Sequence, residues 1–167
     1  FPLRLLFCNK CKLVQLGHIV SPELLFKKYL YVSSTSPVFV KHFDDYASNV
    51  FKRFHLNKNS LVVDIGSNDG ILLRPFKKFG AKVLGVDPAE DIAKKATKEG
   101  LPTLPFFLNQ KVADKISEKY GDADIICANN VFAHVDDLNE LTKAIKIILK
   151  PNGVFIIEAP YLIDLIE

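Results

Sequence analysis

The fold is decided by the stretch Val62-Val63-Asp64-Ile65-Gly66-Ser67-Asn68-Asp69-Gly70, in which an apolar run leads into a loop bounded by two glycines. A helical pattern begins directly after it, at Ile71. Glycine at both ends lets the backbone turn sharply and come close to a ligand. Because open α/β sheets bind ligands at the carboxyl ends of their strands, residues 66–70 are predicted to border a binding site.

The rest of the sequence from Ser60 onward alternates short apolar runs with amphipathic stretches, which is typical of repeated βα units and a parallel sheet. Strands are predicted at residues 61–65, 82–86, 123–128 and 153–157, with a weaker candidate at 102–108 that two prolines interrupt. Helices are predicted at residues 37–54, 71–79, 89–99, 110–120 and 137–149. The last four end at Gly80, Gly100, Gly121 and the turn 150–153, and the first is expected to cover one side of the sheet with aromatic residues. The predicted fold class is α/β with a doubly wound, mainly parallel sheet.

Two other nucleotide-binding loops are disfavoured. The dinucleotide fingerprint G-x-G-x-x-G is not matched, because Asn68 stands where the second glycine would let a pyrophosphate approach. A phosphate-binding P-loop is not matched either, since no Gly-Lys-Ser or Gly-Lys-Thr follows. NAD is therefore a disfavoured cofactor, while a tight turn that binds nothing remains an alternative.

A second signal is Asp87, which comes directly after the strand of residues 82–86 and 17 residues after Gly70. An acidic side chain at that position can accept hydrogen bonds from ribose hydroxyls. Together, the loop and Asp87 resemble class I methyltransferases, which have a Rossmann-like fold and bind S-adenosylmethionine. The resemblance implies that Asp87 holds the ribose and that the loop passes the methionine part, while Asp64 is expected to anchor the loop internally. The predicted cofactor-binding residues are Gly66, Asn68, Asp69, Gly70, Asp87, Pro88, Phe107, Asn129 and Asn130.

The strand of residues 123–128 leads into a segment that contains His134. Imidazole can act as a base or a donor near neutral pH, but a surface or helix-entry role for His134 stays open. Asp136 or Asp137 is expected to cap the next helix, and Cys127 is expected to be a buried thiol. The pair Phe106 and Phe107 is either an adenine contact or part of the core.

The front of the chain carries Cys8-Asn9-Lys10-Cys11, which has the spacing of a zinc knuckle. A structural zinc site needs four ligands, and Cys8 and Cys11 supply two, with His18 as a candidate third. Two free thiols or a redox pair are the alternatives. We therefore predict a partial zinc-binding module over residues 1–36 and an S-adenosylmethionine-binding domain over 37–167.

Composition narrows the class of protein. With 49% hydrophobic and 25% charged residues among 167, the chain can bury one main core. Its net charge of +3 is spread evenly, which argues against a nucleic-acid partner. The sequence contains neither an apolar run of about 20 residues nor a signal peptide, so a cytoplasmic location without a membrane partner is expected. Both ends resemble cuts in a longer chain, whose C-terminal part we expect to be missing.

Five segments resemble the sugar C-methyltransferases that act on nucleotide-linked 4-keto-6-deoxyhexoses: residues 8–16, 31–36, 64–70, 129–134 and 158–162. The resemblance implies carbon methylation through an enolate, with His134 in the substrate pocket and Tyr31 or Tyr46 contributing a phenol. Family members carry a Tyr-Asp-Glu-His segment with the general base further on, which this sequence does not reach.

Three alternatives remain beside the implied nucleotide-sugar enzyme. The methyl group could instead be transferred to an oxygen or nitrogen atom of another small molecule. The chain could also bind S-adenosylmethionine without catalysis, or be a nucleic-acid-binding module, although the even charge argues against the last. The sequence does not predict an oligomeric state.

Overall fold

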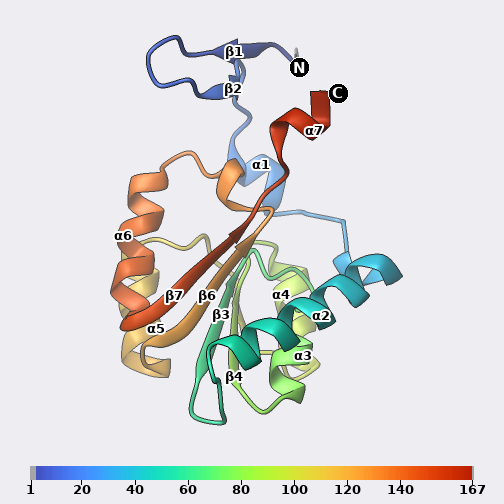
Figure 1. The fold of residues 1–167 in the computed structure, drawn as a ribbon, viewed down its shortest axis with the longest axis vertical. Helices are drawn as coiled ribbons and strands as arrows, with labels where there is room; N and C mark the ends of the chain where they lie inside the picture. Colours follow the sequence, from blue (N-terminus) through green and yellow to red (C-terminus); the bar gives the residue numbers. More distant parts are fainter. Residues whose placement is uncertain (1–2, 167) are drawn as a thin grey trace.

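A parallel sheet of five strands forms the centre of the computed structural model, which describes residues 3–166 (Figure 1). The strand order is β5-β4-β3-β6-β7, and each neighbouring pair is parallel. The chain enters at β3, moves outward through β4 and β5, and then returns to place β6 on the other side of β3. This reversal puts a switch point between β3 and β6, where such sheets bind ligands. The strands are β3 (Leu61–Ile65), β4 (Lys82–Val86), β5 (Thr103–Leu104), β6 (Ala123–Asn129) and β7 (Leu149–Glu158).

Helices cover both faces of the sheet (Figure 1). Alternate side chains of β3 point to opposite faces, so Val63 packs with α5 (Gln110–Tyr120) and α6 (Leu138–Ile148). Val62 packs on the other face with α2 (Pro37–Arg53) and α3 (Leu73–Lys78), while α4 (Glu90–Lys98) joins the same core through Ala96. The prediction that the aromatic helix covers the sheet is confirmed, because Phe43 of α2 is only 7% exposed.

The N-terminal part forms a hairpin that stands away from the sheet (Figure 1). Its strands β1 (Leu5–Phe7) and β2 (Val14–Leu16) pair antiparallel, and most of their side chains are exposed. The short elements α1 (Pro22–Phe26) and η1 (Ser33–Thr35) lead from the hairpin to α2. The remaining short elements are η2 (Phe132–His134) and α7 (Leu162–Ile166). Within residues 3–166, none of the helices has the length and apolarity that a membrane span requires.

The largest differences from the predicted boundaries occur at three places. The predicted turn 150–153 lies inside β7, where the register jumps so that Leu149 pairs with Ala123 and Val154 pairs with Ile125. The helix predicted from Ile71 begins at Leu73, because residues before it still belong to the turn after β3. The strand β5 is confined to the two residues between Pro102 and Pro105, since proline has no N–H to donate to a neighbouring strand.

Candidate functional site

A cavity of about 720 Å³ lies at the carboxyl ends of β3, β4 and β6. This volume falls in the range of small-molecule and cofactor sites. One wall comes from the sheet, through Gly66–Asn68, Asp87–Pro88 and Asn129–Val131. The opposite wall comes from the N-terminal part, through Phe26, Tyr29 and Tyr31. The loop after β3 therefore borders a cavity at the switch point of the sheet, as its sequence predicted.

The two glycines of this loop have different surroundings. Gly66 lines the cavity with φ of 69°, and a Cβ there would lie 2.4 Å from Cγ2 of Val131. Gly70 has φ of 80°, and a Cβ there would lie 2.4 Å from Cδ1 of Leu101 in the core. Both positions require glycine, but Gly66 is the one that faces the cavity.

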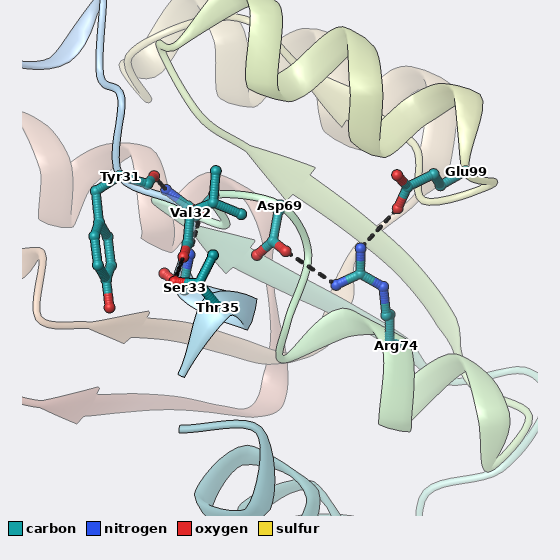
Figure 2. A network of polar contacts seen from close by, with 8 residues as sticks. Tyr31, Val32, Ser33, Thr35, Asp69, Arg74 and Glu99 are labelled. Carbon is teal, nitrogen blue, oxygen red and sulfur yellow. Dashed lines mark hydrogen bonds and ion pairs between the residues drawn. The ribbon is translucent and has the colours of Figure 1, made fainter. Parts of the chain in front are cut away.

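Asp69 belongs to the loop but lies outside the cavity lining. Its Oδ2 accepts a hydrogen bond from Arg74 over 3.3 Å, and Arg74 also donates to Glu99 over 2.7 Å (Figure 2). The other oxygen, Oδ1, is buried without a hydrogen-bond partner among residues 3–166. Asp69 and Gly70 therefore do not line the cavity, and their predicted cofactor contacts stay a prediction.

Asp87 lies at the end of β4, where two backbone N–H groups orient its carboxylate. Oδ2 accepts from the amide of Asn68 over 2.8 Å, and Oδ1 accepts from the amide of Ala89 over 2.9 Å. Burial raises the pKa of Asp87, while these two hydrogen bonds act in the opposite direction. Asp87 and the adjacent Pro88 both line the cavity. Each carboxylate oxygen can accept more than one hydrogen bond, so Asp87 can still accept from a ligand.

Asn68 lines the cavity, but its side-chain amide bonds to the N-terminal part. Oδ1 accepts from the amide of Ser33 over 3.0 Å, and Nδ2 donates to the carbonyl of Tyr31 over 2.9 Å. The sequence predicted a cofactor contact at Asn68 and gave no indication of this connection. Its partners are 35 and 37 residues away along the chain, beyond the range of local patterns.

Asn129 and Asn130 follow β6 and line the cavity on the other side of β3. The side-chain amide of Asn129 is buried and makes no hydrogen bond of good geometry in the described part of the chain, although it lies close enough to the Tyr46 hydroxyl to act on the pKa of that group. Asn130 has φ of 56°, and its N–H donates to the carbonyl of Glu158 over 2.7 Å. A buried polar group without a full set of hydrogen bonds is costly, so Asn129 and the unpaired hydroxyl of Ser67, which also lines the cavity, are positions where a polar ligand would gain hydrogen bonds.

Asp64 is 4% exposed and borders the cavity from the middle of the sheet. Burial raises its pKa well above the ordinary value for a carboxyl group, and the nearby charge of Asp87 raises it further. The sequence predicted only an internal anchoring role for this residue. Its carboxyl group instead lies where a cationic ligand would favour its ionised form.

Of the three side chains predicted to be catalytic, two line the cavity and one does not. His134 and Tyr31 both line the cavity, and both are exposed. Tyr46 does not line it, because its hydroxyl lies 3.6 Å from the sulfur of the buried Cys127, and burial raises the pKa of Tyr46. Tyr46 is thus outside the cavity lining but next to Asn129, which lines it, whereas the prediction that Cys127 is a buried thiol is confirmed.

Several cavity residues were missed from the sequence, notably Phe26 and Tyr29. Phe26 lies with its ring centroid 6.3 Å from that of His134, and Tyr29 lies 6.3 Å from Tyr31. The closely spaced aromatic residues at 26, 29 and 31 were the available signal. Phe106 and Phe107 both line the cavity, so an adenine contact by either stays a prediction, and Asp137 caps α6 by accepting from the amide of Glu140.

Cys8 and Cys11 lie in the turn of the β1–β2 hairpin. The amide of Cys11 donates to the sulfur of Cys8 over 3.5 Å, and hydrogen bonds from Cys11 lower the pKa of the Cys8 thiol. Such bonds favour the thiolate form that a zinc ion binds. No cluster of three or more His, Cys, Asp or Glu side chains suited to one metal ion occurs between residues 3 and 166, so His18 does not complete the set.

Comparison with known proteins identifies the family. A sequence profile described as "Methyltransferase domain" matches residues 39–164. The chain belongs to the methyltransferase domain family. Its doubly wound sheet has the class I, Rossmann-like fold of these domains, in agreement with the fold predicted from the sequence.

Two curated methyltransferases illustrate the similarity in sequence. The C-methyltransferase NovU of Streptomyces niveus is 34% identical over 167 residues, which is 100% of this chain and 40% of NovU. A ubiquinone biosynthesis O-methyltransferase of Rhodopseudomonas palustris is 30% identical over 116 residues, covering 64% of this chain and 45% of that protein. This methyltransferase domain thus spans less than half the length of both relatives.

Solved structures share the fold at low sequence identity. The PH0226 protein of Pyrococcus horikoshii superposes with a TM-score of 0.62 at 19% identity, over 81% of this chain and 61% of that one. The plantazolicin methyltransferase BpumL, solved in complex with a triazolic desmethylPZN analogue and S-adenosylhomocysteine (SAH), superposes with a TM-score of 0.56 at 17% identity, over 75% of this chain and 48% of that one.

Proposed function

We propose that this methyltransferase domain binds S-adenosylmethionine and supplies the methyl donor site of a methyltransferase. The observation that carries the proposal is the cavity at the switch point, which brings together the Cβ-free Gly66, the oriented carboxylate of Asp87 and the unpaired amide of Asn129. These groups fit the cofactor, because a ribose offers hydroxyl donors and the methionine part offers an ammonium group and a carboxylate.

Each residue has a separate role in this proposal. Asp87 accepts hydrogen bonds from the ribose hydroxyls, and Asn129 pairs its buried amide with the methionine part. Gly66 leaves space at the bend of the loop, and Phe107 offers an aromatic face to the adenine. Bound S-adenosylmethionine supplies a methyl group on a sulfonium centre, which attracts the carboxyl groups of Asp64 and Asp87.

We further propose that the acceptor is a carbon atom next to the ketone of a nucleotide-linked deoxysugar. The nucleotide-linked deoxysugar follows from the resemblance of residues 8–16, 31–36, 64–70, 129–134 and 158–162 to the sugar C-methyltransferases. The similarity to the C-methyltransferase NovU supports carbon as the acceptor atom, because it covers the whole chain, including residues before position 39 that the family profile does not reach. Some of these residues, among them Tyr29 and Tyr31, form the second wall of the cavity. In this proposal His134 moves a proton at the acceptor, and the Tyr31 hydroxyl donates a hydrogen bond to the acceptor oxygen.

Methylation of oxygen in another small molecule is the second candidate, which the similarity to O-methyltransferases favours. Deuterium exchange separates the two. With SAH bound, a carbon methyltransferase acting through an enolate exchanges the hydrogen next to the ketone of a nucleotide-linked 4-keto-6-deoxyhexose in D₂O, and His134→Ala slows the exchange. Transfer of a labelled methyl group to a hydroxyl without any such exchange contradicts carbon methylation.

We also propose that Cys8 and Cys11 are two of the four ligands of a structural zinc ion. Support comes from their shared hairpin turn and the lowered pKa of Cys8. We expect a purified sample to retain zinc that Cys8→Ser and Cys11→Ser both release, measured by elemental analysis after dialysis. Equal zinc content in the parent and both variants contradicts this role. The cytoplasmic location and the expected lack of nucleic-acid partners remain predictions.

A further inference from the structure

The side chain of Asn68 pairs with the backbone on both sides of one residue, Val32. Its Oδ1 accepts from the N–H of Ser33 over 3.0 Å, and its Nδ2 donates to the carbonyl of Tyr31 over 2.9 Å. Val32 between them is extended, with φ of −116° and ψ of 113°. A planar amide that bonds to the flanking C=O and N–H of an extended residue imitates the pairing of a neighbouring strand. The contact is therefore specific for the backbone conformation of this segment.

The backbone of Asn68 is attached to the other side of the cavity. Its N–H donates to Oδ2 of Asp87 over 2.8 Å, and its φ of 49° directs the side chain away from the regular path of the loop. Asn68 is 6% exposed, so these bonds compete little with water. One residue thus connects the proposed ribose-binding carboxylate with the segment that carries Tyr31.

This segment, residues 29–35, is here named the strap. Figure 2 shows Tyr31, Val32, Ser33 and Thr35 of the strap toward one side of the view, and Asp69 with its partner Arg74 toward the other. Tyr29, Tyr31 and Ser33 line the cavity. Tyr29 is 41% exposed and Tyr31 is 45% exposed, so packing holds the strap only weakly. Its position therefore depends strongly on the two hydrogen bonds from Asn68.

We propose that Asn68 is a positioning residue that couples occupancy of the cofactor side to the position of the strap. A ligand on Asp87 restrains the loop, Asn68 transmits this restraint, and the strap then holds Tyr31 at the acceptor side. Because such coupling is reciprocal, a bound acceptor would also strengthen cofactor binding. This inference rests on the proposed function, since it requires a cofactor that contacts Asp87.

The coupling can be measured without an acceptor, by amide hydrogen exchange of the strap with and without SAH. The amides of Thr35 and Ser36 are suitable reporters, because they donate to Val32 and Ser33 within the strap and make no bond to Asn68. In the parent protein we expect saturating SAH to slow their exchange by about 5-fold or more, the lower range of typical allosteric coupling.

Two variants distinguish positioning from mere structural support. Asn68→Gly keeps the left-handed backbone and its N–H but removes both side-chain bonds, so at an SAH concentration that saturates this variant the effect of SAH on Thr35 and Ser36 should fall below about 2-fold. Thr35→Val is the matched control, because it removes the Thr35 hydroxyl bond to the Val32 carbonyl, 2.7 Å long, which does not involve the loop. It should speed exchange in both states and keep the response to SAH.

The outcomes are separable. If SAH binds the parent but leaves strap exchange unchanged, or if Asn68→Gly responds to SAH as strongly as the parent, the coupling is refuted and the cofactor site stands. If a folded parent protein does not bind SAH at all, both the coupling and the proposed function are refuted. Loss of the SAH response in Asn68→Gly, with retained SAH binding and a normal response in Thr35→Val, supports the coupling.

Discussion

The two walls of the cavity are built in different ways. On the sheet wall, Asp87 is 7% exposed and receives two backbone hydrogen bonds, and Gly66 has no space for a Cβ. On the strap wall, Tyr29 and Tyr31 are 41% and 45% exposed. The sheet wall is thus organised by the fold itself, whereas the strap wall depends on a few contacts. This difference suggests that the cofactor side is fixed and that acceptor preference can change through the strap.

The largest effect on cofactor binding is expected from Gly66→Val. The new Cβ would clash with Val131 at a φ of 69°, which a branched side chain tolerates poorly. We expect the affinity for S-adenosylmethionine (SAM) to fall by more than about 100-fold, measured by calorimetry. The free energy of unfolding should fall by about 1–3 kcal/mol, measured by urea unfolding. The control is Gly80→Ala, also at positive φ but with open space around it, which should lower stability by about 1 kcal/mol and leave affinity unchanged.

Replacement of Asp87 should have the next largest effect. Asp87→Ala removes the acceptor for Asn68 and Ala89 together with the proposed ribose contact. Hydrogen bonds to a charged group contribute about 1.5–3 kcal/mol, so SAM affinity should fall by about 10- to 100-fold. Asp87→Asn keeps one acceptor oxygen and should give an intermediate loss. If Asp87→Ala binds SAM as tightly as the parent protein, the sheet wall does not hold the ribose.

The raised pKa of Asp64 predicts a pH dependence of stability without cofactor. The folded protein retains the proton of Asp64 to a higher pH than the unfolded chain, so this stabilisation is lost as pH rises through the folded pKa. The free energy of unfolding should therefore decrease as pH rises above pH ~4, and Asp64→Asn should make this decrease shallower by up to about 1.4 kcal/mol per pH unit, measured by urea unfolding. A shallower slope should remain in the variant, because burial also raises the pKa of Asp87. Identical pH profiles for the parent and Asp64→Asn would show that Asp64 does not titrate in this way.

The smallest effect on cofactor affinity is expected from changes at the acceptor side. His134→Ala should leave SAM affinity within about 2-fold of the parent value and reduce methyl transfer by about 10²- to 10⁴-fold, the usual range for a lost acid or base. Tyr31→Phe should reduce transfer less, by about 5- to 10-fold, because it removes one neutral hydrogen bond. Steady-state transfer of labelled methyl groups measures both. A large loss of SAM affinity in either variant would contradict the division between the walls.

Much of the sheet wall could be predicted from the sequence. The bounds of β3, β4 and α5 agree with the prediction, because apolar runs and glycines punctuate them clearly. The positions of Gly66 and Asp87 at neighbouring strand ends then follow from the order of a doubly wound sheet. Within the loop, Asp69 and Gly70 lie outside the cavity lining, a detail that the motif alone does not distinguish.

The strap wall could not be predicted in the same way. Asn68 meets Tyr31 and Ser33 across more than 30 residues, so no local pattern encodes the contact. Tyr46 lies on a helix with aromatic residues on several faces, and only packing shows that its hydroxyl lies beside Cys127 and that the residue is outside the cavity lining. Long-range contacts of exposed or isolated side chains depend on tertiary structure, which periodicity does not report.

Calorimetric titration of the protein with SAM and, separately, with NAD tests the central claim most directly. The account predicts saturable binding of SAM at one site per chain and no binding of NAD at the same concentrations, because Asn68 replaces the glycine that a pyrophosphate requires. Binding of NAD, or a folded sample that binds no SAM, would contradict it.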